Sequence, residues 1–304
     1  LFGGYDAMDI TERDPFANRN LDGETERSSY AYHALTVAID SVKDPEVVQT
    51  NVLSVPGVTT AGITDKLLDV AEDRGDCLAV IDLAGGYQPT SENANGFSSR
   101  VGSVNSTVNT FNDRAINSSF GCAFYPWVRV QDTFSDSTVW LPPSVVAIGA
   151  FSFTDRNAEP WFAPAGFTRG GLTKGAGGLR VLGVADRLRS KDRDDLYEAN
   201  INPIGTFPNE GIVILGQKTL QTTRSALDRI NVRRLLIYTK RQITAVANDL
   251  LFEQNVQDTW NNFISSAEPI LRDIQAGFGL EDFKLVLDNT TTTPELRDRN
   301  VLYA

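Results

Sequence analysis

The sequence has very few of the residues that usually carry catalysis or bind metal ions. It contains one histidine, His33, one methionine, and two cysteines, Cys77 and Cys122. Because zinc sites are built mainly from cysteine and histidine, a zinc centre here would need an unusual set of carboxylates. Both cysteines lie inside apolar runs, which indicates buried free thiols rather than a disulfide or a redox pair. His33 lies in the segment SYAYHALTV, which is typical of an ordinary packed or half-exposed helix residue.

Long apolar runs and an excess of basic residues are also missing. No run of about 18 or more apolar residues occurs, and no signal-peptide pattern is visible, so we expect no membrane insertion. The 39 acidic residues outnumber the 28 basic ones and give a net charge of −11. Phosphate affinity comes from clustered lysine and arginine, so we expect no direct nucleic-acid partner. A chain of 304 residues that is 41% hydrophobic can bury a sizeable core in one large or two modest domains.

The motifs of several enzyme classes are incomplete. The glycine-rich stretch 170–178, GGLTKGAGG, lacks the GxxxxGK[ST] pattern of a phosphate-binding loop. The acidic runs 9–14 and 192–198 lack EF-hand spacing and are expected to be solvated loops. No GxSxG turn for a nucleophilic serine occurs, and paired carboxylates of the glycosidase type have no specific support. We therefore predict no catalytic residue, no cofactor and no metal.

The order of apolar segments predicts an α/β fold. Strands at 47–55, 76–85 and 120–131 alternate with helices at 63–75 and 97–114, and the middle strand is almost wholly apolar. Such a strand is typical of a parallel sheet covered by helices on both faces, with right-handed crossovers. The further expected elements are a helix at 25–42, a loop at 86–96, a helix at 144–155 after WLPP, a long irregular loop at 161–179, a short helix within 184–201, and a strand at 211–220.

The C-terminal part is organised around the longest predicted helix, at 225–252. Ser225 and Asp228 form a capping box at its start, and apolar residues recur every three or four positions. A second helix is predicted at 257–276 and a strand at 281–288. Basic residues gather on another side of the long helix, which is unusual in so acidic a chain. As a hypothesis, they form an assembly interface, the alternative being a solvated charged face; they are Arg233, Arg234, Lys240 and Arg241.

Several ordered segments resemble contractile phage tail sheath proteins. INVRRLLIYTKRQI, LLFEQNVQDTWNNF and FGLEDFKLVLDNTTTTPELRDRN resemble the C-terminal domain of that family, in the family's order. WLPPSVVAIGAFSFTDRNAEPWFAPAGFTRGGL and EANINPIGTFPNEGIVILGQKTL resemble the segments that precede it. The matching blocks run from about Leu141 to Asn300, and the whole set is more specific than any one block.

The resemblance implies two domains and an assembly. A subtilisin-like sheath domain is expected at 1–224, with a mixed, largely parallel sheet flanked by helices, and a smaller α+β domain at 225–304. The subtilisin-like label concerns the fold and does not carry protease function. The family's neighbouring subunits exchange terminal arms to complete each other's sheets. Since the chain starts at Leu1 rather than Met and stops at Ala304, we expect a fragment that lacks both arms and any outer domains.

The function implied is that of a non-enzymatic structural subunit. Such subunits form helical stacks of hexameric rings around a tail tube and contract to drive the tube through a host envelope. The implied partners are other sheath copies, the inner tube protein, the baseplate and the tail terminator, in a virion tail assembled in the host cytoplasm. Two alternatives stay open: a sheath subunit of a bacterial contractile injection device, and an α/β hydrolase-like enzyme with a pocket near His33.

Overall fold

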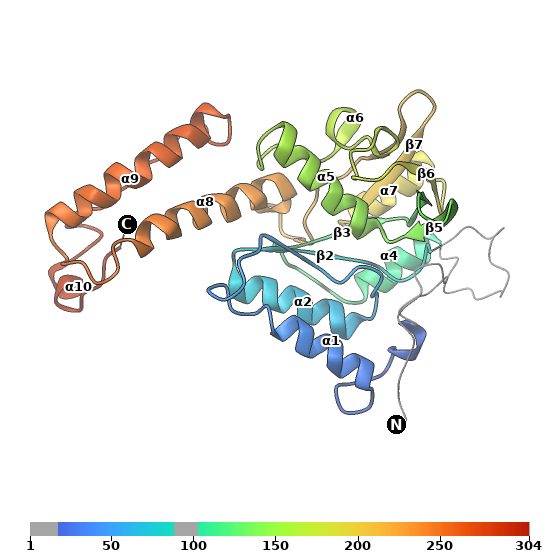
Figure 1. Ribbon diagram of the computed structural model, residues 1–304, viewed down its shortest axis with the longest axis horizontal. Helices are drawn as coiled ribbons and strands as arrows, with labels where there is room; N and C mark the ends of the chain where they lie inside the picture. Colours follow the sequence, from blue (N-terminus) through green and yellow to red (C-terminus); the bar gives the residue numbers. More distant parts are fainter. Residues whose placement is uncertain (1–17, 88–102, 304) are drawn as a thin grey trace. The chain divides into compact units, whose positions relative to one another are not determined.

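The computed structural model describes residues 18–87 and 103–303 (Figure 1). The acidic run 9–14, most of the loop 86–96 and the start of the helix 97–114 lie outside the described residues. By its internal contacts the chain divides into two compact units, Leu1–Arg234 and Leu235–Ala304. The break falls inside a helix, beyond the family-based boundary at 224/225, which stays a prediction. The two units are described separately as unit 1 and unit 2.

Unit 1 is built on a five-stranded sheet with the order β1-β2-β3-β7-β8. The strands are β1 Val52–Ser54, β2 Leu78–Ile81, β3 Gly121–Tyr125, β7 Asn202–Phe207 and β8 Gly211–Ile214. The first four are parallel to their neighbours, and β8 is antiparallel to β7. The predicted mixed and largely parallel sheet is therefore confirmed, although β1 and β8 are shorter than the strands predicted there.

Helices cover both faces of this sheet, as predicted. They are α1 Tyr30–Asp40, α2 Ala61–Arg74, α4 Val104–Asn112, α5 Pro143–Asn157 and α7 Ser190–Glu198. The strand order 1-2-3 places the crossover helices α2 and α4 on one face, because both crossovers step in the same direction. α5 packs on the opposite face, where the rings of Phe124 and Phe151 meet with centroids 6.3 Å apart.

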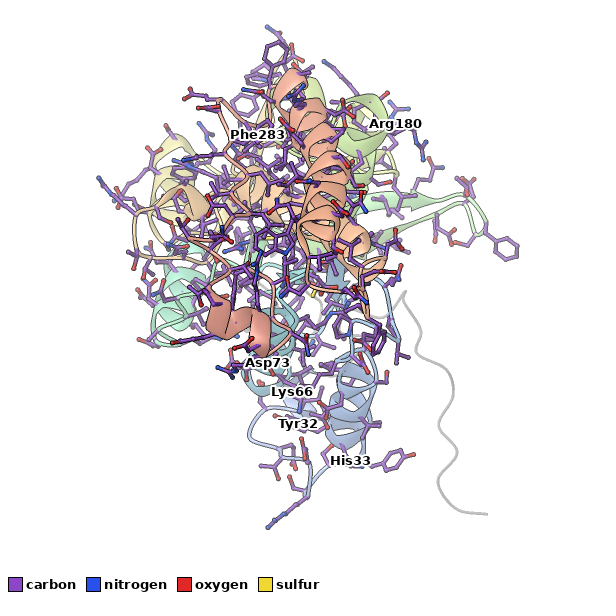
Figure 2. All side chains as sticks on the ribbon, turned by 90° about the vertical axis from the view of Figure 1, so that its left-hand side faces the viewer. Tyr32, His33, Lys66, Asp73, Arg180 and Phe283 are labelled. Atoms are coloured by element: carbon purple, nitrogen blue, oxygen red, sulfur yellow. The ribbon has the colours of Figure 1, made fainter. Side chains whose placement is uncertain are left out.

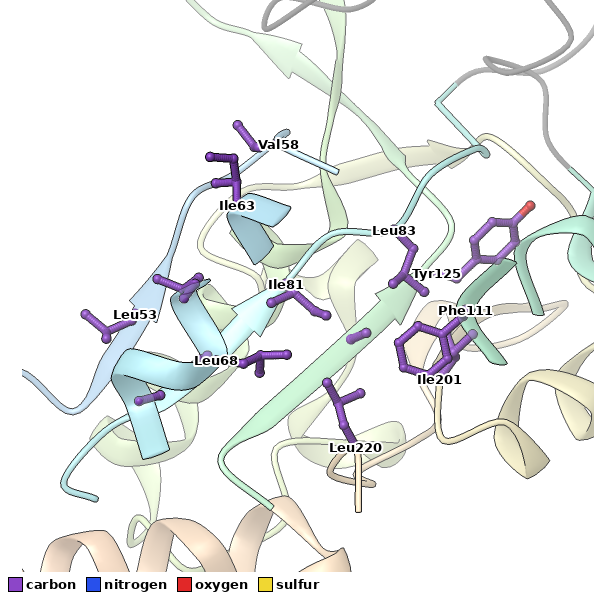
Figure 3. Packing of buried hydrophobic residues seen from close by; sticks show 14 of the residues in the cluster. Leu53, Val58, Ile63, Leu68, Ile81, Leu83, Phe111, Tyr125, Ile201 and Leu220 are labelled. Carbon is purple, nitrogen blue, oxygen red and sulfur yellow. The ribbon is translucent and has the colours of Figure 1, made fainter. Parts of the chain in front are cut away.

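The main core lies between the sheet and the layer of α2, α4 and α7. Ala79 and Ile81 of β2 point into it, and so do Ala123 and Tyr125 of β3, following the two-residue period of a strand. Figure 3 shows Leu68 of α2 beside the sheet residue Ile81, with Phe111, Ile201 and Leu220 further along the same layer. Within the run 76–85, strand β2 is thus buried on both faces because its alternate residues face two helical layers.

A second, three-stranded antiparallel sheet was not predicted. It consists of β4 Val128–Asp132, β5 Ser137–Leu141 and β6 Val181–Val184, in the order β5-β4-β6. The single strand predicted at 120–131 is in fact two strands, β3 and β4. The chain breaks between them at Pro126, which has no backbone N–H to donate to a strand ladder.

The predicted irregular loop 161–179 is ordered and holds two short turns, α6 Gly166–Arg169 and a 3-10 turn, Leu172–Lys174. Its glycines serve packing rather than phosphate binding. A Cβ atom on Gly149 of α5 would lie 2.0 Å from the carbonyl oxygen of Gly177, so position 149 needs glycine for the close approach of helix and loop.

Unit 2 contains most of α8 (Ile230–Asn248), α9 (Gln257–Ala276) and α10 (Pro294–Asp298). The predicted capping box at Ser225 starts a 3-10 turn, Ala226–Asp228, where the Ser225 side chain accepts from the Leu227 amide, and the α-helix begins at Ile230. α9 has the bounds predicted from its apolar stripe. The core of the unit is formed by α9 and the segment after it, with Trp260, Phe263, Ala267 and Leu287 buried.

Candidate assembly interface

The four basic residues of the predicted interface lie on α8 but do not share one surface. Arg233 and Arg234 are buried in unit 1, with 8% and 5% of their surface exposed, whereas Lys240 and Arg241 of unit 2 are exposed. The picture of one continuous basic side is therefore corrected. Two successive residues of a helix point in directions about 100° apart, so Arg233 and Arg234 reach different partners.

Arg233 reaches the segment just before β3. Its guanidinium stacks on the ring of Phe120, 3.9 Å from the centroid, and Nη2 donates to the hydroxyl of Ser119. Burial lowers the pKa of Arg233, but arginine starts so high that the side chain stays charged at neutral pH. Stacking on an aromatic face is one of the few favourable environments for a cation that is removed from water.

Arg234 forms the strongest charged contact of this region. Nη2 donates to both carboxylate oxygens of Asp155 near the end of α5, each at 2.6 Å, and the guanidinium lies 5.0 Å from the ring of Phe151. The Asp155 side chain is one-third exposed, so the pair is only partly removed from water. No pattern in the sequence indicated these partners, because Ser119, Phe120 and Asp155 are far from α8 along the chain.

The segment 281–287 of unit 2 is the second candidate for an assembly contact. The predicted strand there is not formed: in the part of the chain that the structure describes, no backbone group of residues 282–287 pairs with another backbone group. The alternation that suggested a strand is nevertheless present. Leu285 and Leu287 pack toward Trp260, while Asp282 and Lys284 are exposed.

The segment runs beside a groove. Side chains of α9 form one wall and residues 282–285 form the other, around a volume of about 450 Å³. The α9 wall is formed by Ile264, Glu268, Arg272 and Gln275, and Glu268 and Arg272 are joined by an ion pair of 2.7 Å. The Phe283 amide donates to the Asp282 side chain at 2.9 Å, but no backbone group of 282–287 is used in a strand ladder, and such a segment at a groove is a template for strand addition.

The described residues of unit 1 do not assemble a catalytic triad. Asp82, at the end of β2, accepts hydrogen bonds from the Gly57 amide (2.8 Å) and from the amide (3.1 Å) and hydroxyl (2.7 Å) of Ser144. Its partners show that it caps the start of α5, where Pro142 has no side-chain acceptor. His33 is exposed on α1, as Figure 2 shows, and within the described ranges it has no hydrogen bond to Asp82 or Ser144.

The two thiols are buried and free, as predicted. Burial raises the pKa of Cys77 to about 12 and raises that of Cys122 as well, so neither is a reactive thiolate at neutral pH. Among residues 18–87 and 103–303, no three histidine, cysteine, aspartate or glutamate side chains are grouped so that they could hold a metal ion.

Comparison of the whole sequence with known proteins gave relatives of one kind. No family model matches the chain. It is 32% identical over 281 residues to the tail sheath protein of Vibrio phage KVP40, covering 88% of this chain and 40% of that protein. It is 29% identical over 250 residues to the tail sheath protein of Enterobacteria phage T4, covering 81% and 37%. The chain thus spans about two-fifths of the length of the curated relatives that it matches.

Comparison of the structure found solved structures that share its fold. The sheath complex of an extracellular contractile injection system, PVC, in its contracted state, aligns with a TM-score of 0.66 at 20% identity. The match covers 87% of this chain and 68% of that chain. At this identity the likeness shows a shared fold, a mixed α/β sheet with flanking helices.

Proposed function

We propose that this chain, a homologue of phage tail sheath proteins, is part of the structural subunit of a contractile tail sheath. In this proposal copies polymerise as helical stacks of hexameric rings around the tail tube, and contraction drives the tube through the host envelope. The subunit would reside in the virion tail, after assembly in the host cytoplasm, and would act without enzymatic turnover. The structural observation that carries the proposal is the segment 282–287 beside its groove, which has no backbone–backbone pairing among the described residues.

Neighbouring subunits would supply the missing strands. Backbone amides and carbonyls of residues 282–287 lack backbone partners among the described residues, and each buried unpaired group is costly once water is excluded. A strand from another copy would satisfy them and cover the 450 Å³ groove along α9. Backbone pairing of this kind gives affinity without needing a large apolar patch.

The exposed basic pair of α8 is the proposed contact to the inner tube or to an acidic patch on the next subunit. Lys240 and Arg241 are suited to this because they are exposed, whereas Arg233 and Arg234 are buried. The baseplate and the tail terminator are the further proposed partners, at the two ends of the polymer. No helix among the described residues is long and apolar enough to cross a membrane.

Contraction of such a polymer requires rigid subunits and two alternative sets of contacts between them. Packed cores and interfaces change between discrete arrangements rather than deforming continuously, so energy stored at assembly can be released without nucleotide or cofactor. The sheet of unit 1, clamped between two helical layers, is suited to be the rigid part. A bacterial contractile injection system would work by the same physical mechanism. The fold shared with the PVC sheath supports this as the alternative function.

A proline test addresses strand addition directly. The amide of Lys284 makes no backbone hydrogen bond within the described unit 2, and its side chain is exposed, so Lys284→Pro should change the Tm of the isolated protein little. Proline would nevertheless remove a donor from any added strand and weaken it. We expect negative-stain microscopy of the full-length protein to show tubes for the wild type and for Lys284→Ala, and few or none for Lys284→Pro. A wild type that stays monomeric at all concentrations would refute the sheath function.

A charge test addresses the tube contact. Reversal of Lys240 and Arg241 to glutamate should weaken co-assembly with the tube or the growth of the polymer, with circular dichroism unchanged. The double variant Arg187→Glu/Lys191→Glu, at two exposed positions of unit 1, is the control because it changes the net charge by the same amount. Polymers of unchanged yield and salt dependence in the double variant would end this part of the proposal.

A further inference from the structure

The β4–β5 hairpin presents an aromatic side chain to solvent on a fixed turn. Phe134 lies in the turn and is 99% exposed. The carboxylate of Asp132 accepts from the Phe134 amide at 3.0 Å and from the Ser135 hydroxyl at 2.5 Å, and Gln131 donates to Asp136 across the turn at 2.8 Å. Figure 2 shows the hairpin (green) leaving the body of unit 1. Since the turn is already ordered, little conformational entropy would be lost when it binds.

The chemistry of the hairpin tip defines its partner. Between Val130 and Trp140 the chain has two acidic residues, Asp132 and Asp136, and no basic one. Hydrogen bonds from the turn lower the pKa of Asp132, so its charge is retained well below neutral pH. Buried aromatic anchors dominate the energetics of many interfaces. The tip therefore suits a site with an apolar hollow for one ring and a basic rim.

Unit 1 contains a hollow with a mixed apolar and polar lining at another place on its surface. It is enclosed by the end of α4, the end of α7 and the segment near Leu220, and its volume is about 280 Å³. An apolar cavity of roughly 150 Å³ is enough to take up benzene, so a phenyl ring has room here. The apolar side chains that line it are Phe111, Ala115, Ile116, Ala199 and Leu220.

A basic groove adjoins the hollow. The two share Glu198, Asn200 and Thr222 in their walls, and the groove adds Lys218, Arg224 and Arg229. The acidic residues in the groove lining are Glu198 and Asp228. Three basic and two acidic side chains give the groove a net positive charge, although the whole chain has a net charge of −11.

The carboxylate of Asp228 is already paired with Arg229 at 3.3 Å. Within the described part of the chain, Arg224 has no ion pair and remains exposed. An anionic tip is therefore attracted to this rim.

We propose that the Phe134 tip of one copy of this chain inserts into the hollow of a second copy, with Asp132 and Asp136 beside Lys218 and Arg224. This proposal rests on the proposed function, because it assumes that copies of the chain lie side by side in a polymer. Tip and hollow are different surfaces, so the contact is heterologous and repeats from copy to copy into a ring or a helix. It would be a contact of unit 1 that is independent of strand addition in unit 2.

Disulfide trapping tests the contact in the full-length protein. Thr133 beside the tip and Thr222 in the groove wall are both exposed, and the native Cys77 and Cys122 are buried and will not compete. Mixed single variants Thr133→Cys and Thr222→Cys should give covalent dimers on mild oxidation, and a double variant should give a ladder. Phe134→Ala in the same background should lower the dimer yield at limiting concentration by at least about tenfold, as expected for loss of an anchor residue. Val47→Cys, at a position 75% exposed on unit 1, replaces Thr133→Cys as the control and should give no dimer.

The outcomes separate this contact from the sheath function itself, which is scored by tubes of the wild type. Tubes together with a specific Thr133–Thr222 cross-link support both proposals. Tubes without the cross-link, or a yield that Phe134→Ala leaves unchanged, overturn the contact and leave the sheath function standing. A specific cross-link without tubes supports the contact and counts against the sheath. Neither tubes nor cross-link overturns both.

Discussion

Asp82 should make the stability of unit 1 depend on pH in the direction opposite to most carboxylates. The side chain is buried at the end of β2, and burial raises its pKa from 3.8 to about 6, although hydrogen bonds from Gly57 and Ser144 act the other way. The folded state then holds its proton more tightly than the unfolded state. Between about pH 4 and pH 6 the folded protein binds more protons at this site, so raising the pH through this window lowers the free energy of unfolding.

The size of the effect follows from the shift. One pKa unit corresponds to about 1.4 kcal/mol, so a shift of about two units removes about 3 kcal/mol of stability between pH 4 and pH 7. The Asp82→Asn side chain cannot titrate, so the variant should lack this pH-dependent contribution to the unfolding free energy. It has a constant cost of about 1–3 kcal/mol instead, because its NH₂ group faces donors from Gly57 and Ser144.

Urea unfolding at several pH values measures both terms. The difference in unfolding free energy, wild type minus Asp82→Asn, should fall by about 3 kcal/mol from pH 4 to pH 7, while contributions from all other carboxylates cancel in the difference. A difference that stays constant, or widens as the pH rises, would refute the argument that desolvation outweighs the hydrogen bonds at Asp82.

Three further substitutions follow from the packing. Gly149→Ala forces a Cβ against the carbonyl of Gly177 and should cost about 2 kcal/mol or more of unfolding free energy, measured by urea titration; a neutral result would contradict the close approach. Asp155→Ala should cost about 2 kcal/mol, less than for a fully buried pair because Asp155 is one-third exposed, and the loss should shrink when Arg234 is also replaced by methionine. Phe278→Gly should stabilise the isolated protein by up to about 1 kcal/mol, because Phe278 has a φ of 62° and is 88% exposed; a lower Tm would show that its ring packs internally.

The periodicity of the sequence predicted best those elements whose buried face is marked by their own apolar residues. α9 was predicted with its observed bounds because Trp260, Phe263, Ala267 and Leu271 keep one helical face buried. The apolar run 76–85 contains β2 for a similar reason, since both of its faces are covered. α1 is shorter than predicted because Ser29 caps it, its hydroxyl accepting from the Tyr32 amide at 3.3 Å.

The missed strands include two that pair with a neighbour along the chain, since β5 pairs with β4, and β7 pairs with β8 as well as with the distant β3. β7 contains Pro203 and Gly205, which argue against a strand in sequence. It is held in the sheet by the side chain of Asn202, which donates to the carbonyls of Ala123 (3.0 Å) and Lys218 (2.8 Å) and accepts from the Lys218 amide (2.7 Å). These side-chain bonds add to the backbone pairing of β7 with β3 and β8, and they leave no periodic signal in the sequence. The burial of Arg233 and Arg234 was missed for the same reason, since their partners lie in other segments.

The strand predicted at 281–288 was wrong in an informative way. Alternation along a chain indicates which face of an extended segment is buried, and Leu285 and Leu287 do turn their side chains toward the core of unit 2. Pairing is a separate property, because it needs a second strand with free backbone groups, and the described residues offer none to 282–287. A sequence selected to be one strand of a sheet shared between chains would show this combination, with one face buried within its own unit and the edges unpaired. The disagreement between pattern and pairing therefore marks the place where another chain is most needed.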